Sequence, residues 1–413
     1  MHDTAIARVV DTKLPEPEFD SDAEDDLEID ISDFCEAVGD YKLGDLGALF
    51  PICIGDIIHV GHDQYYRIDH RLGRGAFSTV WVAYGSKQDM SVALKILRAG
   101  GTSNAGEKEY TSQRMLGEAN IDKSHLNLYQ DTFYLQSPYG KHRVLVLPLA
   151  GPSLSKERLE ITRTLKARMS AAKDLLEALR SLHQAGLLSD INLGNILWKV
   201  HPEFVQAITD DTSQVLGAPT QRLRLSSTEK EFKSGHRVLP ASFPPESLSD
   251  RVYLDMWSFM VVFIYLYLGK IAFPEVSGGG SDPMLPLARI IETLGPLPEE
   301  WSKPKPKFAA SSYESSKIPT APKCIIKTWL REDWERDVPR ISKQYKELAK
   351  YGDERYAKIA KRTAQEAKVK EQAESHALKV ICSVFRHRPE TRLTAAQLLE
   401  NPDWKKFMEL CGV

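Results

Sequence analysis

The stretch Arg71 to Leu97, RLGRGAFSTVWVAYGSKQDMSVALKIL, holds residue types that could bind a phosphate group. Gly73 and Gly75 stand two apart in a predicted tight turn, where glycine lets the backbone bend and bring its amides close to a bulky anion. Strand-like residues follow, and the next strand carries the small Ala93 and then Lys95. The spaced glycines alone are equally typical of a structural hairpin, but with the lysine they predict a nucleotide-phosphate site.

A second group of polar residues lies at 187–198, LLSDINLGNILW. Asp190 and Asn195 are five apart in a predicted loop that leads into a short apolar strand. Because aspartate and asparagine commonly form turns, this pair alone does not distinguish a site from a structural loop. The segment before it, Ile161 to Ala185, has apolar residues every three or four positions and is followed by Gly186, so it predicts a long helix with a glycine stop.

The first stretch resembles the glycine-rich loop and third-strand lysine of eukaryotic protein kinases, G-x-G-x-x-G-x-V followed by V-A-I-K, with Ser78 at the third glycine. The order of IGD, a short strand and FSTVW is similar to the entry into SR-protein kinases. The resemblance implies ATP as cofactor, with these residues around it: Leu72, Gly73, Arg74, Gly75, Ala76, Phe77, Ser78, Val80, Ala93 and Lys95.

The segment from Gly106 to Gly117 predicts a helix that faces the lysine strand. In the kinase pattern a glutamate of this helix holds the lysine in an ion pair, and Glu109 is the favoured candidate. Glu107 is the alternative, since an exposed helix normally carries acids without a role. Further on, the resemblance implies that Leu147 borders the adenine and that 148–150 forms the hinge.

DINLGN resembles the kinase catalytic loop H-R-D-x-x-x-x-N. By that match Asp190 accepts or orients the proton of the substrate hydroxyl, and Asn195 holds a magnesium ion. The chain departs from the family here, because Leu188 replaces the histidine, Ser189 the arginine and Asn192 the lysine. The missing lysine removes a positive charge that would neutralise the transferred phosphoryl group.

A larger departure follows Asn195, where a short strand and D-F-G are expected. The chain offers FVQAITDDTSQV, residues 204–215, which we interpret as that strand with Asp210 at the metal-ligand position. Asp211 and Thr212 replace the phenylalanine and glycine. Either Asp210 takes the metal role in a degenerate motif, or the segment belongs to an insertion and the true motif is missing.

The C-terminal part continues the resemblance. Pro245 and Glu246 match the end of the A-P-E motif, and Asp255 precedes an apolar helix that reaches Leu268. RPETRLTAAQLL resembles the last kinase subdomain, in which Arg392 pairs with Glu246; the alternative is that Arg392 caps a helix.

The ordered motifs cover about residues 50–407 and imply an α+β, bilobal protein-kinase fold. A small antiparallel β-sheet N-lobe with helix C is expected at 49–150, and a larger, mainly helical C-lobe at 151–413 with an insertion near 302–375. Residues 1–48 include the acidic run EPEFDSDAEDDLEIDISDF and predict a disordered or loosely docked tail.

The 413-residue composition is that of an ordinary globular protein, with 42% hydrophobic and 27% charged residues. A net charge of −3 gives no reason to expect nucleic acid or an anionic membrane as partner. Five scattered cysteines without a CxxC favour reduced thiols, and the N-terminus lacks an apolar signal core. We therefore expect a soluble protein of the cytoplasm, the nucleus or both; the sequence does not give the oligomeric state, and a monomer is our working expectation.

The resemblance implies a serine/threonine protein kinase that uses ATP and Mg²⁺ on a protein substrate, for which Ser/Arg-rich sequences are a candidate. The competing hypothesis is a pseudokinase that binds nucleotide or docks partners without turnover. A small-molecule kinase on the same fold is a third class, and the SR-kinase-like entry disfavours it.

Overall fold

The structure is a computed structural model that describes residues 5–10, 49–75 without 51 and 53, 77–99, 105–137, 140–156, 163–186, 191–217, 248–249, 256–272 without 271, 290–298 without 292 and 297, and 323–413. It divides into two compact units. Unit 1 comprises Met1–Asn120, Asn127–Pro152 and Lys199–Ser249, and unit 2 comprises Ile121–Leu126, Ser153–Trp198 and Asp250–Val413. Unit 1 thus contains most of the residues expected for the N-lobe, without 121–126, together with 199–249, which were expected in the C-lobe. Among the described residues, no helix is long and apolar enough to cross a bilayer.

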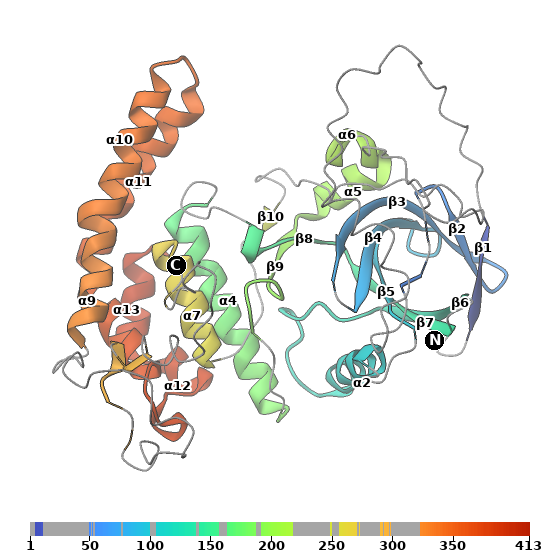
Figure 1. Cartoon of the computed structure of the whole chain (residues 1–413), viewed down its shortest axis with the longest axis horizontal. Coiled ribbons are helices and arrows are strands. Elements are labelled where there is room, and N and C mark those ends of the chain that lie inside the picture. The colour runs from blue at the N-terminus through green and yellow to red at the C-terminus, as the bar shows by residue number, and fades with distance from the viewer. Residues whose placement is uncertain are drawn as a thin grey trace, which may run out of the picture. The chain divides into compact units, whose positions relative to one another are not determined.

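Unit 1 is built on a sheet that closes into a barrel in the order β1-β2-β3-β4-β5-β7-β6 (Figure 1). Neighbouring strands are antiparallel except β1 and β6, which run parallel, so the expectation of an antiparallel sheet holds for all but one pairing. The strands are β1 (Ile6–Val10), β2 (Ile57–Val60), β3 (Gln64–Arg74), β4 (Ser78–Gly85), β5 (Met90–Leu97), β6 (Asp131–Ser137) and β7 (Gly140–Pro148).

Strand β1 corrects the prediction of a disordered or loosely docked tail at the N-terminus. Residues 6–10 pair with β2 and with β6 and close the barrel. The segment IARVV is short and mostly apolar, and pairing with two distant strands provides partners for its backbone groups. Residues 11–48, which hold the acidic run, lie outside the described residues.

Strand alternation gives the sheet two distinct faces. The alternate residues Val92, Leu94 and Ile96 of β5 and Val144 and Val146 of β7 join residues of β4 in one buried apolar cluster. Odd-numbered residues of β5 and β7 therefore point to the opposite face, which includes Lys95. A slip of one residue in register would exchange these two sets, so the apolar cluster fixes which residues face the site.

Unit 1 also carries helices α2 (Ala105–Glu118), α5 (Pro202–Asp210) and α6 (Thr212–Leu216). The expected strand at 204–210 is wrong, because this segment is helix α5. Its buried residues, Val205 and Ile208, are three positions apart, which is a helical spacing, and Pro202 starts the first turn. The helix packs against β5, where the amide N–H of Ser91 donates to Thr209 Oγ1 at 2.8 Å.

His142 of β7 lies fully buried in unit 1. Its Nδ1 is 3.1 Å from the carbonyl oxygen of Leu97, and its Nε2 is 2.8 Å from Ser137 Oγ. A neutral ring with the proton on Nδ1 satisfies both contacts, the serine hydroxyl donating to Nε2. Burial lowers the pKa of His142 from 6.5 to about 4.

This histidine predicts a loss of stability in mild acid. Between pH 6.5 and about 4 the unfolded chain binds a proton at His142 and the folded chain does not, so stability falls as the pH falls through this window. The shift corresponds to about 3 kcal/mol at the acid end. His142→Asn should flatten the dependence of the urea midpoint on pH, even if it lowers the midpoint at pH 7. Burial also lowers the pKa of His70, so a residual slope is expected. The exposed control His62→Gln should keep the pH dependence of the urea midpoint of the native chain. The same unchanged dependence in His142→Asn would contradict the assignment.

Unit 2 is mainly helical. Its longest described helices are α4 (Leu165–Gln184), preceded by the N-cap Thr164, and α11 (Glu354–Val384). Gly186, with a φ of +71°, follows α4 as the sequence predicts. The apolar helix α7 (Met256–Leu268) is buried over most of its length, also as predicted. The other helices of unit 2 are the 3₁₀ helix Leu154–Lys156, α9 (Lys323–Glu332), the π-helical turn Asp333–Asp337, α10 (Val338–Ala349), the 3₁₀ helix Pro389–Thr391, α12 (Ala395–Glu400) and α13 (Pro402–Leu410).

The three remaining short strands are β8 (Ala150–Ser153), β9 (Leu197–Val200) and β10 (Leu248–Ser249), and β9 pairs antiparallel with β10. Within unit 2, α10 and α11 run side by side in Figure 1.

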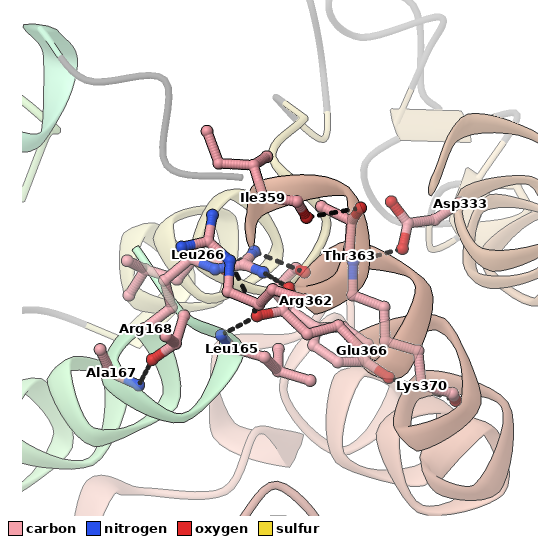
Figure 2. Close-up of polar contacts among 12 residues, drawn as sticks. Leu165, Ala167, Arg168, Leu266, Asp333, Ile359, Arg362, Thr363, Glu366 and Lys370 are labelled. Atoms are coloured by element: carbon pink, nitrogen blue, oxygen red, sulfur yellow. Dashed lines mark hydrogen bonds and ion pairs between the residues drawn. The ribbon is translucent and has the colours of Figure 1, made fainter. Parts of the chain in front are cut away.

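Buried charges join the helices of unit 2 (Figure 2). Arg168 of α4 donates to the carbonyl oxygens of Leu266 and Tyr267 at the end of α7, and to Glu366 Oε2 of α11 at 3.1 Å. The other oxygen of Glu366 accepts from the amide of Leu165 at 2.7 Å. One carboxylate thus caps the start of α4 and neutralises the arginine that fastens it to α7.

Arg392 lies in the segment that resembles the last kinase subdomain. It donates to the carbonyl oxygens of Arg386 and His387, which follow α11, and its guanidinium lies 4.7 Å from the ring centroid of Trp257. Both carbonyls lie beyond the last residue of α11, so these contacts hold the segment after the helix, and the alternative that Arg392 caps a helix stays untested. Its predicted partner Glu246 lies outside the described residues, so that pairing stays a prediction.

Candidate active site

The sheet of unit 1 brings three of the predicted nucleotide residues into one row. Gly73 of β3 is paired with Val80 of β4, and Val80 is paired with Lys95 of β5. The sequence separation of these residues is large, but adjacent strands lie about 4.8 Å apart. Val80 therefore lies between Gly73 of β3 and Lys95 of β5 in one row across the sheet.

The turn between β3 and β4 leaves open space above its glycines. A Cβ atom built on Gly73 or on Gly75 would meet nothing within 4 Å. Neither glycine has a positive φ, so the expectation that the bend itself demands glycine is not supported at these positions. The absence of side chains instead leaves the backbone accessible to a bulky ligand, which fits the close approach of a phosphate.

The other predicted residues of the turn are placed around that space. Leu72 is half-buried in β3, Arg74 is exposed at its end, and Phe77 is 45% exposed in the loop. Ser78 begins β4, where its carbonyl oxygen accepts from the Gly75 amide at 2.9 Å. Ala76 lies outside the described residues.

Lys95 is held by the favoured glutamate. Its Nζ donates to Glu109 Oε1 of α2 at 2.6 Å, and the two side chains are 27% and 30% exposed. Gln113, one helical turn later, donates to the same oxygen at 3.2 Å, and its own Oε1 accepts from the Tyr129 amide at 3.0 Å. The sequence did not single out Gln113 for a role, although its spacing of four from Glu109 places it on the same helix face.

The alternative glutamate has a different partner. Glu107 accepts two hydrogen bonds from Arg143 of β7, both at 2.9 Å. The guanidinium of Arg143 is also stacked 3.7 Å from the ring centroid of Tyr110 and 4.4 Å from that of Tyr134. This bidentate pair docks α2 on the sheet, so the two acids have separate tasks. The sequence did not indicate the role of Arg143, because its partner is 36 residues away.

An apolar surface lies beside the cation on the same face of the sheet. Ala93 is two residues before Lys95 and is paired with Val82 on one side and Leu147 on the other. All three are buried. Together they form an aliphatic row in the sheet beside the lysine, and the contact of Leu147 with adenine stays a prediction.

The catalytic-loop segment of unit 2 is described from Ile191 onward. Asn192 Oδ1 accepts from the amides of Gly194 and Asn195 at 2.9 and 3.1 Å, which makes a tight asparagine turn. A Cβ on Gly194 would lie 3.0 Å from that oxygen, so a small residue is needed there. Asn195 is exposed at the end of this turn. Asn192 thus builds the loop that presents Asn195, a role that the sequence did not predict for it.

Asp210, the predicted metal ligand, belongs to unit 1 and ends helix α5. It is exposed, and its Oδ1 accepts from Gln206 Nε2 at 2.8 Å. The next residue, Asp211, is the N-cap of α6 and accepts from the Gln214 amide. Because 202–216 forms two helices in place of the expected strand, the insertion alternative describes this segment better. Metal binding by Asp210 stays a prediction.

The proposed base, Asp190, lies outside the described residues, as do Pro245, Glu246 and Asp255. The structure therefore brings together Lys95, Glu109, Val80, Ala93 and the glycines in unit 1, and it places Asn195 on a defined turn in unit 2.

Comparison with known proteins gives a family match over most of the chain. Residues 66–404 match the protein kinase domain family. The match begins in β3 and extends into α13, so it includes both units.

Individual relatives are protein kinases at low identity, several of them named as SRSF or SRPK kinases. Protein kinase dsk1 of Schizosaccharomyces pombe is 28% identical over 44% of this chain and 34% of its own length. SRSF protein kinase 3 of Sus scrofa is 25% identical over 52% of this chain and 37% of its own length. Serine/threonine-protein kinase SRPK of Physarum polycephalum is 32% identical over 29% of this chain and 27% of its own length. The matches thus span about a third of the length of these relatives.

Proposed function

The chain belongs to the protein kinase domain family, similar to the SR-protein kinases, and from that premise we propose that it transfers the γ-phosphoryl group of ATP to a serine or threonine hydroxyl of a protein. The observation that carries the proposal is the ion pair of Lys95 with Glu109, which lies beside a glycine turn. A Cβ atom on either glycine of this turn would have open space around it. The names of the relatives favour a Ser/Arg-rich substrate.

The proposal gives each of the main site residues a task. Lys95, oriented by Glu109, binds the α- and β-phosphates, and Ala93 with Leu147 contacts the adenine ring. The amides of the glycine turn lie over the phosphates. Asn195 offers an amide oxygen, a ligand type that magnesium accepts, and the ion would neutralise phosphate charge when bound. Asp190 orients the attacking hydroxyl and accepts its proton.

The competing proposal is a pseudokinase that binds nucleotide without transfer. It is favoured by one observation in the loop itself. Asn192 occupies the position of the family's lysine, and its side chain is used for a turn, so it supplies no positive charge to the transferred group. Catalysis of phosphoryl transfer is mostly positioning and charge neutralisation, so this loss should reduce the rate more than nucleotide binding.

The two proposals are separated by phosphate transfer from labelled ATP to a Ser/Arg-rich peptide. We expect incorporation by the native chain, none into a peptide whose serines are alanines, and a drop to background in Asp190→Ala. Asp63→Ala, an exposed aspartate in a turn, is the matched control and should retain transfer. Equal background incorporation by the native chain and Asp190→Ala would refute the kinase proposal. A thermal shift with magnesium and ATP would then support the pseudokinase.

The last proposal concerns the location of the protein in the cell. An SR-kinase-like enzyme would meet its substrates in the cytoplasm or nucleus, and we propose that distribution. Fluorescence of the tagged full chain in cells would test it.

A further inference from the structure

Outside the candidate site, unit 2 holds a group of three metal-ligand side chains. His125 lies in the segment 121–126, and Asp174 and Glu177 lie on α4. The two carboxylates are three residues apart, so they project from the same face of the helix. His125 is buried, with 8% of its side chain exposed, and Glu177 is 30% exposed.

The distance between His125 and Glu177 suits a shared cation. His125 Nε2 and Glu177 Oε2 are 3.5 Å apart, and ligand atoms of all three residues lie within 4.8 Å of one another. A direct charge-assisted hydrogen bond would be shorter, at about 2.7–2.9 Å. Four ligands at about 2.0–2.2 Å from a tetrahedral zinc ion stand roughly 3.4 Å from each other. The histidine and glutamate therefore have the separation of two ligands on one ion.

The negative charges near this group also favour a bound cation. Carboxylates three residues apart on a helix repel each other. Asp122, in the same segment as His125, adds a further negative charge nearby, and the Ser124 amide lowers its pKa, with smaller contributions from His125 and Arg180. Arg180 of α4, three residues after Glu177, is a positive group near enough to lower the pKa of Asp122, and Lys123 lies in the segment itself.

We propose that His125, Asp174 and Glu177 bind one divalent transition-metal ion, with zinc as the fitting species and a solvent molecule as fourth ligand. An imidazole nitrogen with two carboxylate oxygens is a donor set for zinc, whereas calcium and magnesium take oxygen ligands. The ion would fasten the segment 121–126 to α4. This site is independent of phosphoryl transfer.

The test uses the full-length chain without a histidine tag, stripped with EDTA and then titrated with zinc chloride by calorimetry. We expect one binding event per chain that is weakened at least about 10-fold in Glu177→Gln and in Asp174→Asn. Cobalt(II) in place of zinc should give the visible absorption of a tetrahedral ion, and that absorption should be lost in the same variants. Circular dichroism verifies that these conservative variants are folded, which His125→Gln need not be.

His62→Gln and Glu203→Gln are the matched controls, because both residues are exposed and lie outside the group. They should bind zinc as the native chain does. Equal zinc affinity in the native chain and in both carboxylate variants would overturn the site, since binding would then come from other residues. Absence of zinc binding by the native chain would also overturn it.

Discussion

Replacing Lys95 with methionine is expected to lower phosphoryl transfer by on the order of 100-fold and to remove the thermal shift caused by magnesium and ATP. The reason is geometric. Lys95 is the cation that β5 places beside the glycine turn, and Glu109 holds its Nζ at 2.6 Å. Methionine keeps the volume of the side chain and removes only the charge and the donors. Lys108→Met, an exposed lysine of α2, is the matched control and should behave like the native chain.

Helix α2 allows the roles of two identical side chains to be compared, because Glu107 and Glu109 lie two residues apart on it. Glu109→Gln should weaken the response to ATP, since the lysine loses its charged partner. Glu107→Gln should instead lower the free energy of unfolding by about 1–3 kcal/mol and leave the nucleotide response intact, since it weakens the partner of the buried Arg143. A native ATP response in Lys95→Met, or identical effects of the two glutamate variants, would refute these roles.

Removing one member of the buried pair Asp333–Lys370 is expected to cost the most stability. Both side chains are 3% exposed, and Lys370 Nζ donates to Asp333 Oδ2. Burial lowers the pKa of Lys370, and the charge of Asp333 opposes that shift. Asp333→Ala therefore leaves an ammonium without its carboxylate in a dry site, and we expect a loss of about 3–5 kcal/mol in the free energy of unfolding.

The double variant Asp333→Leu with Lys370→Met distinguishes a pair effect from loss of packing. Because both charges disappear together, we expect it to be within about 1 kcal/mol of the native chain, or more stable. Lys368→Met, an exposed lysine two residues earlier, should change stability by less than about 0.5 kcal/mol. The measurement is the urea midpoint followed by circular dichroism. A double variant as unstable as Asp333→Ala would show that the charges are not the cause.

Several features of the site were predictable from local sequence. The helix at 105–118, the long helix α4 and the apolar helix α7 follow from periodicity and from their end residues. The pairing of Lys95 with Glu109 was also predicted. Strand alternation fixes the face of the lysine, and helical spacing fixes the face of the glutamate, so both ends of the contact are encoded nearby.

Other features had no local signal strong enough to decide them. The segment 204–210 was expected to be a strand because of its position after the catalytic loop, but Val205 and Ile208 are spaced for a helix that packs on β5. Strand β1 is too short to be recognised without its partners β2 and β6. In both cases a contact with a distant segment selects the conformation, and single-sequence patterns do not contain that contact.

By itself, the sequence determined the glycine turn, the lysine that follows it, the order of the kinase-like motifs and the helices with clear periodicity. These depend on residue type and spacing along a few turns of chain. Only the tertiary structure decided that Glu107 belongs to Arg143 and that Asp333 neutralises Lys370. Each of these choices depends on which buried charge or unsatisfied amide lies within hydrogen-bonding distance after packing, because leaving such a group unpaired costs more than the pairing itself contributes.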